Sequence, residues 1–405
     1  MALPTIVELG VVLTALAVAG GLAVRLGQSV IPAYILAGIV VGPSAPVEVA
    51  GVPLAVISRE GFVEAFADLG LVALLFFLGV HVSFERLVEN YRRLLASGLL
   101  DFVVNVAIGV GLGVLFGFGP LGTLFVAGIV YISSSAVVTK SLVERGWIAD
   151  AESEVILGVL VFEDVAIAVY LTVVSAVALH GGTLLDAALR AGTGLGFLGV
   201  VAVVGWVGSA RIERLLRTPS DELFLLRVLG VATLVAGTAR FTSVSVGVTA
   251  FVVGAVVGRT DTTDRIERTL VPVRDLFSAV FFFAIGLSTR VAALADLAGL
   301  LAVAVVATTA GKLLTGSLAG RLYDLGPRRS FRVGVGTVAR GEFSLVLATL
   351  AAGLAAAGPA RLVPEFGVGY VLATSVLGTL SMRHEDRLAD LLGLEFETTG
   401  SEGEP

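Results

Sequence analysis

Two adjacent carboxylates, Glu163 and Asp164, are the residues whose types and spacing most clearly suggest chemistry in this 405-residue sequence. They lie in the middle of an apolar run at about residues 153–178. A charged carboxylate at the centre of a bilayer costs at least a few kcal/mol, so such residues usually mark the path of an ion or a proton. Neighbouring residues on a helix point about 100° apart. One carboxylate can therefore face a water-filled cavity while the other pairs with a cation on another helix.

Lys312 is the expected cation. Of the 27 basic residues only Lys140 and Lys312 are lysines, and Lys312 lies far from either end of a long apolar run. A lysine that snorkels to the membrane surface would lie near the end of its span, so we expect Lys312 to form a buried ion pair with Glu163 or Asp164. Three other charged residues lie nearer the ends of their runs, where local pairing or snorkelling is expected. They are Asp68, Asp101 and Arg227.

Two polar stretches interrupt the apolar pattern elsewhere. One extends from Tyr131 to Ser141 and is rich in serine, and the other extends from Gly334 to Ser344 and combines glycines with Arg340 and a glutamate. Irregular backbone at membrane depth is tolerated only where it lines a cavity or is buried in protein. Taken singly, interhelical serines and a snorkelling Arg340 would have structural explanations. Together, in helices expected to run in opposite directions, they indicate the paired broken helices of an inverted repeat.

The composition is that of a membrane protein. Apolar residues make up 56% of the chain and charged residues 15%, compared with about a quarter charged in soluble domains. The 50 glycines suit closely packed membrane helices. The chain has no cysteine, which excludes a disulfide framework, a thiolate nucleophile and Cys-based metal sites. We expect no cofactor and no nucleic-acid partner; membrane lipid is the expected surrounding.

Thirteen apolar runs are long enough for membrane helices, which need about 20 residues to cross the hydrocarbon core. We therefore predict an all-α polytopic membrane protein with about 13 transmembrane helices. The N-terminus lacks a basic n-region, so the first run is expected to be a helix rather than a cleavable signal. The runs lie at about 6–24, 30–46, 62–80, 94–117, 120–143, 153–178, 186–208, 222–239, 244–258, 271–289, 293–320, 333–357 and 365–382.

The distribution of arginines predicts the orientation. Arginines gather in alternate loops, which the positive-inside rule assigns to the cytoplasm. This pattern predicts an N-terminus outside the cell and a cytoplasmic C-terminus. Residues 1–383 are expected to form one transmembrane unit, and residues 384–405 a short acidic cytoplasmic tail.

Several of these motifs together resemble the monovalent cation:proton antiporter superfamily, in the branch that holds Kef-type potassium efflux and Nap-type sodium antiporters. The segment from Phe162 to Ala166 resembles the acidic pair of that family at the membrane centre. The segment from Ser133 to Val137 resembles its unwound stretch, and the segment from Arg340 to Phe343 the partner stretch. The segment from Phe282 to Leu287 matches a further family motif. The resemblance extends over nearly the whole chain.

The resemblance implies a secondary antiporter, not an enzyme, that exchanges Na⁺ or K⁺ for H⁺ across the plasma membrane. It implies two crossed broken helices and a homodimer. Each protomer would have a core of the helices at about 94–178 and 293–382 that moves as an elevator, and a scaffold and dimer domain made of the remaining helices. The nucleotide-sensing domain common in Kef-type relatives is not expected in this chain.

By the same resemblance Asp164 would bind the transported cation or the proton, and Glu163 would pair with Lys312. The hydroxyl groups of Ser133 and Ser134, with nearby carbonyls, would supply further oxygens for the ion. Hard oxygen ligands of this kind suit Na⁺ or K⁺. Besides Lys312, three residues are expected as supporting charges, one of which, the lysine, would repel a second cation. They are Arg340, Glu342 and Lys140.

Other classes of membrane protein remain open. A sodium-coupled solute symporter can share crossed broken helices, but it usually lacks a buried lysine beside an acidic pair. A membrane hydrolase would need a nucleophile and a base, whereas His81, His180 and His384 all lie at span ends. A channel with a rigid carbonyl filter would not need paired interruptions.

Overall fold

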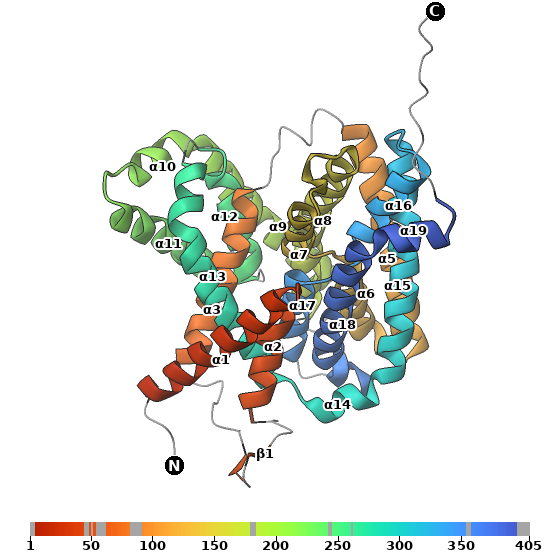
Figure 1. Cartoon of the computed structure of the whole chain (residues 1–405). Coiled ribbons are helices and arrows are strands. Elements are labelled where there is room, and N and C mark those ends of the chain that lie inside the picture. The colour runs from red at the N-terminus through yellow and green to blue at the C-terminus, as the bar shows by residue number, and fades with distance from the viewer. Residues whose placement is uncertain are drawn as a thin grey trace, which may run out of the picture. The chain divides into compact units, whose positions relative to one another are not determined.

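The computed structural model describes residues 5–43, 48–49, 52–53, 62–81, 91–178, 184–241, 245–260, 262–353 and 358–394. Almost all regular structure in these residues is helical (Figure 1). Two short strands, β1 (Glu48–Val49) and β2 (Val52–Pro53), pair antiparallel. His180 and the acidic residues 395–405 of the expected tail lie outside the described residues.

The chain divides into two compact units. Unit 1 comprises residues 1–83, 166–296 and 349–368, and unit 2 comprises residues 84–165, 297–348 and 369–405. The helices α8 (Ala151–Ala178), α17 (Glu342–Ala352) and α18 (Val363–Arg383) each continue from one unit into the other.

The remaining helices of unit 1 cover the N-terminal part of the chain and its middle. They are α1 (Thr5–Arg25), α2 (Val30–Val41), α3 (Phe62–Val80), α9 (Leu184–Val207), α10 (Ser209–Leu216), α11 (Asp221–Thr238), α12 (Val246–Val257), α13 (Thr263–Ser288) and α14 (Val291–Asp296), with 3-10 turns at Ala239–Phe241 and Gly358–Leu362.

Glycines allow the helices of unit 1 to approach at backbone distance. A Cβ on Gly79 of α3 would collide with the carbonyl oxygen of Phe251 in α12, and one on Gly254 of α12 would collide with the carbonyl oxygen of Phe76 in α3. Such close contacts at small residues hold helices together in lipid, where helix association has no hydrophobic driving force. Small residues thus allow α3 and α12 to pack closely against each other.

Unit 2 contains most of the buried polar residues among the described ones, and six α-helices lie entirely within it. They are α5 (Tyr91–Leu115), α6 (Gly119–Tyr131), α7 (Ser135–Glu144), α15 (Ala298–Leu322), α16 (Pro327–Gly336) and α19 (Glu385–Leu391), with a 3-10 turn at Trp147–Ala149. Local sequence explains several helix starts in this unit. Pro120 lies in the first turn of α6 and Pro327 is the first residue of α16. In the first turn of a helix the N–H group that proline lacks would have no intrahelical partner. Ser134 caps α7 by accepting a hydrogen bond from Val137 N.

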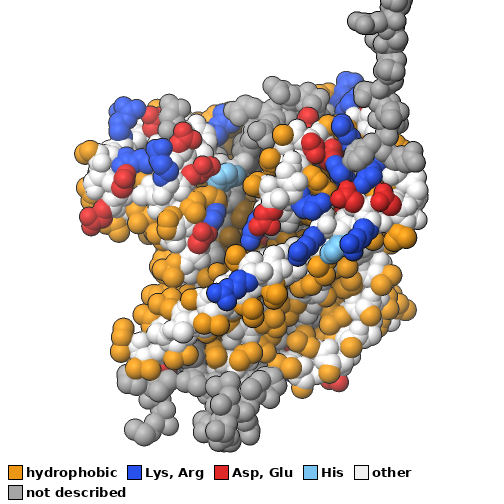
Figure 2. Space-filling view, in the orientation of Figure 1, with side chains coloured by type: hydrophobic (Ala, Val, Ile, Leu, Met, Phe, Trp, Pro, Cys, Tyr) orange, Lys and Arg blue, Asp and Glu red, His pale blue; other side chains and the backbone are white. Residues whose placement is uncertain are grey.

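Many of these helices are long and apolar enough to cross a membrane. Eight described helices could each cross a membrane, or nine if the pair α9 and α10, bent by 70°, forms one span. The short apolar helices α2, α12 and α17 fall within three further predicted runs, so the number 13 remains a prediction. Large apolar side chains are exposed, such as Val18 and Leu22 of α1, as expected for surfaces that contact lipid. Figure 2 shows broad hydrophobic surface, while charged side chains gather over α10 and α11 and, separately, over α16 and α19.

Candidate ion-binding site in unit 2

Two helix interruptions meet in unit 2, as the polar stretches predicted. Residues 132–134 separate α6 from α7, and residues 337–341 separate α16 from α17. The two non-helical segments hydrogen-bond each other: Ser134 N donates to Ala339 O at 2.8 Å, and Ser133 Oγ donates to Thr337 O at 3.0 Å. Backbone that has left its helix is thereby paired inside protein.

Arg340 satisfies carbonyl groups that the interruptions leave free. Its side chain is 1% exposed, and its Nε donates to Val130 O at 3.0 Å. Its Nη1 donates to Thr337 O at 2.8 Å and to Val338 O at 2.7 Å. The last carbonyls of a helix carry partial negative charge and lack intrahelical partners. Arg340 therefore balances the C-terminal ends of both α6 and α16 and does not snorkel.

Glu342 contacts the N-terminal end of a helix, that of α7, whereas Arg340 contacts C-terminal ends. Its Oε2 accepts a hydrogen bond from Ser134 Oγ at 2.9 Å, and its Oε1 accepts a longer one from Ala136 N at 3.4 Å. A carboxylate is favourable beside the positive N-terminal end of a helix. Gly341 permits this contact, because a Cβ there would collide with the Ser134 side chain.

The predicted ion pair between Lys312 and Glu163 is present. The Lys312 side chain is fully buried, and its Nζ lies 2.5 Å from Glu163 Oε1. The same carboxylate accepts a hydrogen bond from Ser133 N at 2.6 Å, and it shares with Thr337 O the single proton of the Ser133 hydroxyl, whose Oγ lies 3.1 Å from Glu163. Glu163 is thus held by one ammonium group and by two donors of the interrupted segment.

Asp101 corrects an expectation. The sequence suggested local pairing or snorkelling, but Asp101 is buried and its Oδ2 lies 2.6 Å from Lys312 Nζ. Its Oδ1 accepts hydrogen bonds from Thr315 Oγ1 at 2.7 Å and from Asn105 Nδ2 at 2.9 Å. We call Asp101, Asn105, Glu163, Lys312 and Thr315 the Lys312 cluster. Of the other two residues, Arg227 donates a hydrogen bond to Leu215 O at 2.7 Å, and Asp68 is exposed.

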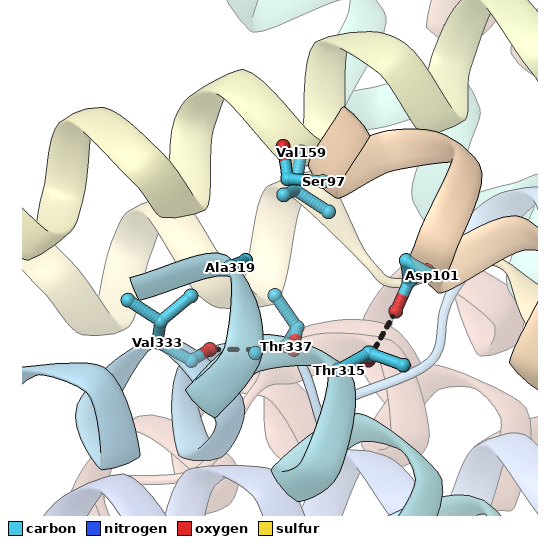
Figure 3. Close-up of a pocket in the computed structure, with 8 residues that line it drawn as sticks. Ser97, Asp101, Val159, Thr315, Ala319, Val333 and Thr337 are labelled. Carbon is cyan, nitrogen blue, oxygen red and sulfur yellow. Dashed lines mark hydrogen bonds between the residues drawn. The ribbon is translucent and has the colours of Figure 1, made fainter. Parts of the chain in front are cut away.

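Small residues bring the helices of the Lys312 cluster together. Gly98 of α5 leaves room for the ring of Phe162, the residue before Glu163 in α8. Gly311 of α15 lies against Asn105 of α5 in the same way. A narrow pocket, too small to hold a water molecule, adjoins Asp101. Figure 3 shows its lining and the Thr315–Asp101 hydrogen bond.

Asp164 lacks such partners. It is 7% exposed, and within the part of the chain that the structure describes its carboxylate accepts only from Ser135 Oγ, 3.4 Å from both Oδ1 and Oδ2. Good O–H···O hydrogen bonds are about 2.7–2.8 Å long, so this contact is weak. The negative charges of Glu342 and Glu163 also act on Asp164. Among the described residues, Asp164 is thus a buried carboxylate that has neither a strong donor nor a cation beside it.

Ser135 was not singled out by the sequence. The hydroxyl groups predicted to surround the ion, those of Ser133 and Ser134, bond to Glu163 and Glu342 instead. Ser135, the first residue of α7, is the one beside Asp164. Its place directly after Ser133 and Ser134 marked it as a candidate, but the sequence does not show which of the three hydroxyl groups faces which carboxylate.

Lys140 is not brought to these carboxylates. Its side chain is 44% exposed, and its Nζ lies 3.6 Å from Glu144 one turn further along α7. Among the described residues, no group of three or more His, Cys, Asp or Glu side chains could hold a metal ion. What the arrangement offers an ion is therefore one carboxylate, with a hydroxyl beside it.

The sequence resembles known transporters over almost its whole length. The family model described as "Sodium/hydrogen exchanger, transmembrane" matches residues 11–384. The K(+)/H(+) antiporter subunit KhtU of Bacillus subtilis is 34% identical over 391 residues, which cover 96% of each chain. The Ammonium/H(+) antiporter subunit AmhT of Alkalihalophilus pseudofirmus is 27% identical over 400 residues, which cover 96% of this chain and 95% of AmhT.

The fold resembles that of a solved antiporter. The structure of the sodium proton antiporter MjNhaP1 from Methanocaldococcus jannaschii at pH 8 matches with a TM-score of 0.73 and 16% sequence identity. The match covers 95% of this chain and 98% of that one. The predicted all-α antiporter-like fold is thereby confirmed.

Proposed function

Because the chain belongs to the sodium/hydrogen exchanger family, we propose that it is a secondary active antiporter that exchanges a monovalent cation for H⁺ at Asp164. The observation that carries this assignment is the contrast among four buried carboxylates. Asp101, Glu163 and Glu342 each accept at least one hydrogen bond of 2.9 Å or shorter, whereas from the described residues Asp164 accepts only the Ser135 hydroxyl, at 3.4 Å.

The chemistry follows from what a buried carboxylate requires. An ionised carboxylate without donors or a counter-ion is costly away from water. A proton removes the charge of Asp164, and a metal cation neutralises it. The Asp164 oxygens and Ser135 Oγ are hard ligands that suit Na⁺ or K⁺. Since one carboxylate holds either ligand but not both, carrying it from one side to the other couples the two fluxes.

The finer features belong to the same proposal. We place the transporter in the plasma membrane as a homodimer, with the N-terminus outside and the C-terminus in the cytoplasm. The helices at about 94–178 and 293–382 form the moving core of an elevator, and the remaining helices form the scaffold. No cofactor is required, and Arg340, Glu342 and Lys312 are the supporting charges. The relatives are named for K⁺, ammonium and Na⁺, so the transported ion is Na⁺, K⁺ or a cation of similar size.

The experiment is a flux assay in proteoliposomes with a preset pH gradient. Addition of NaCl or KCl, with no organic solute, should collapse the gradient, and choline chloride should not. Asp164→Asn should reduce the rate to that of protein-free liposomes. Asp324→Asn is the matched control, because Asp324 is exposed and has φ 60°, a conformation that asparagine tolerates.

Two outcomes would contradict the proposal. Collapse that needs an added organic solute would indicate a sodium-coupled symporter. Exchange that persists in a correctly inserted Asp164→Asn protein would remove Asp164 from the site.

A further inference from the structure

The C-terminal helix α19 is packed into unit 2 by buried ion pairs. Its first residue, Glu385, and Ala389 one turn later are both 0% exposed. The helix lies beside α16 (Figure 1). It ends in a regular cap, in which Leu394 N donates to Ala389 O and Gly393 has φ 66°. A helix that buries a carboxylate in this way needs a cation buried with it.

Arg332 of α16 is that cation, and it has a second buried carboxylate as a partner. Its Nε lies 2.9 Å from Glu385 Oε2, and its Nη1 lies 2.9 Å from Glu152 Oε1 in the first turn of α8. Glu152 is 0% exposed and Arg332 is 9% exposed. The guanidinium group also stacks over the ring of Trp147, 4.6 Å from the ring centre. One arginine therefore joins α8, α16 and α19, with a different nitrogen for each carboxylate, a geometry that a lysine would not reproduce.

Two further arginines extend this group of charges. Arg328, one turn before Arg332 on α16, lies 3.3 Å from Glu385 and 2.8 Å from Asp386. Arg145, at the C-terminal end of α7, lies 3.6 Å from Asp386. The helix α7 is thereby joined to α19 as well. We call Arg145, Glu152, Arg328, Arg332, Glu385 and Asp386 the Arg332 cluster.

The three helices that the Arg332 cluster joins to α19 are also the helices that lead to the ion site. Ser135, whose hydroxyl lies beside Asp164, is the first residue of α7, and Asp164 itself is on α8. The helix α16 ends where the second interruption begins. Between the cluster and the site, α8 and α16 stay in close contact: a Cβ on Gly336 of α16 would collide with Ile156 of α8, each one turn after a residue of the cluster. A shift at the cluster would therefore move the helix parts that meet at the site.

We propose that Arg332 and Glu385 are positioning residues of the exchange reaction: they fix how far α8 extends relative to α7 and α16, and thereby the distance between the Asp164 carboxylate and the Ser135 hydroxyl. This inference rests on the proposed function and deepens it. Binding groups need a precision of about 0.5 Å from the residues that support them. Two oxygens hold one cation only while both stay within coordinating distance, so an axial shift of α8 weakens cation binding. The C-terminal helix thus acts on the site without touching the cation.

The charges of the Arg332 cluster act on the site through position rather than through their electric field. The two buried carboxylates of the cluster, on α8 and α19, face two arginines of α16, so this buried part is balanced. The cluster also lies at a distance: Glu152 precedes Asp164 by about 18 Å along α8, at about 1.5 Å per residue. The charges that act on Asp164 are those of Glu342 and Glu163. An effect of Glu385 on cation binding would therefore report the placement of α8.

The test is the KM for the cation in proteoliposomes, measured for Glu385→Gln alone and together with Ser135→Ala. Glutamine keeps the size of the side chain and removes the charge that holds Arg332. Glu385→Gln should raise the KM by about 2–10-fold, the range expected for the loss of one hydroxyl ligand, with kcat nearly unchanged. In the Ser135→Ala protein the same change should have little further effect, because the contact that it displaces is already lost. Glu385→Asp, which keeps the charge, should restore part of the affinity.

The matched control is Asp390→Asn. Asp390 is on the same helix, its side chain is 72% exposed, and it lies 3.5 Å from Arg328. The change has the same chemistry as Glu385→Gln but leaves both ion pairs of Arg332 in place. Asp390→Asn should therefore keep the KM of the wild type.

A second variant covers the case in which Glu385→Gln does not fold. Glu152→Gln separates Arg332 from α8 and leaves α19 in place, and it should raise the KM in the same way. An unchanged KM in the folded variants, with only a lower melting temperature, would overturn the inference. So would a rise in KM that is equally large with and without the Ser135 hydroxyl. A wild type without exchange, or exchange that survives Asp164→Asn, would instead overturn the proposed function.

Discussion

Glu163 and Asp164 are neighbours on one helix and are both buried, yet their surroundings in unit 2 are opposite. Glu163 has an ammonium group at 2.5 Å and a backbone N–H at 2.6 Å. In the part of the chain that the structure describes, Asp164 has one hydroxyl group, that of Ser135, at 3.4 Å. Burial alone therefore does not distinguish Glu163, which is held by fixed donors, from Asp164, the carboxylate that we propose binds the ion. The difference lies in whether fixed donors satisfy the charge, and the following predictions test that difference from the largest effect to the smallest.

Lys312→Met should have the largest effect on stability. Removal of one partner from a buried ion pair costs about 3–5 kcal/mol, because the remaining charge is left unpaired, and here two carboxylates would be left. Thermal unfolding in detergent should therefore occur at a much lower temperature. Lys140→Met, at the only other lysine, is the matched control and should melt like the wild type. Equal melting of the two variants would contradict a stabilising role for the Lys312 cluster.

Arg340→Met should have the next largest effect. The change removes a guanidinium group that donates to three carbonyl oxygens at the ends of α6 and α16. Hydrogen bonds to charged groups contribute about 1.5–3 kcal/mol each, although the loss is not additive, so we expect a destabilisation of about 2–4 kcal/mol. Arg321→Met, at an exposed position of α15, provides the comparison. A variant that melts normally would mean that the two helix ends do not need the arginine.

Two serine variants should separate stability from ion binding. Ser133→Ala removes hydrogen bonds to Glu163 and Thr337 O and should lower the melting temperature. Ser135→Ala should leave melting unchanged and raise the KM for the cation by about 2–10-fold, the equivalent of about 0.5–1.5 kcal/mol for one hydroxyl ligand. The reverse pattern, with Ser133→Ala affecting only KM, would mean that Ser133 is the hydroxyl ligand, as the sequence predicted.

The KM for the cation should depend on pH, because the proton and the cation compete for Asp164. This is the smallest of the expected effects. If the proton and the cation bind the same carboxylate, protonation of Asp164 at lower pH removes the cation site. The apparent KM should then rise as the pH falls, by up to about tenfold per pH unit for each competing proton. A KM that is constant across the acidic limb, measured at clamped membrane potential, would mean that the two ligands use separate sites.

The sequence was sufficient to predict the ion pair between Glu163 and Lys312, but not all the residues that surround this pair. Glu163 and Lys312 are opposite charges deep in two apolar runs, so each needs a partner and each is available to the other. Asp101 was placed nearer a span end, because linear position along a run does not show the depth at which a packed helix meets α15. Its partners, Lys312 and Thr315, are more than 200 residues away along the chain, and no local pattern relates them.

The prediction of the serine beside Asp164 failed for a different reason. Ser133 and Ser134 lie in the non-helical segment and Ser135 opens α7. The helical rule of about 100° per residue does not apply across such a boundary, so the sequence cannot tell which hydroxyl faces which carboxylate. The interruption itself was predictable, because serine and glycine runs at membrane depth require buried partners.

Proton release on cation binding tests the central claim most directly. Purified protein in weakly buffered detergent solution, at a pH where Asp164 is partly protonated, should release protons when NaCl or KCl is added but not when choline chloride is added. Asp164→Asn should release none, while Asp324→Asn should behave like the wild type. Cation binding without proton release by the wild type, or undiminished release by Asp164→Asn, would contradict the claim that one carboxylate exchanges the two ligands.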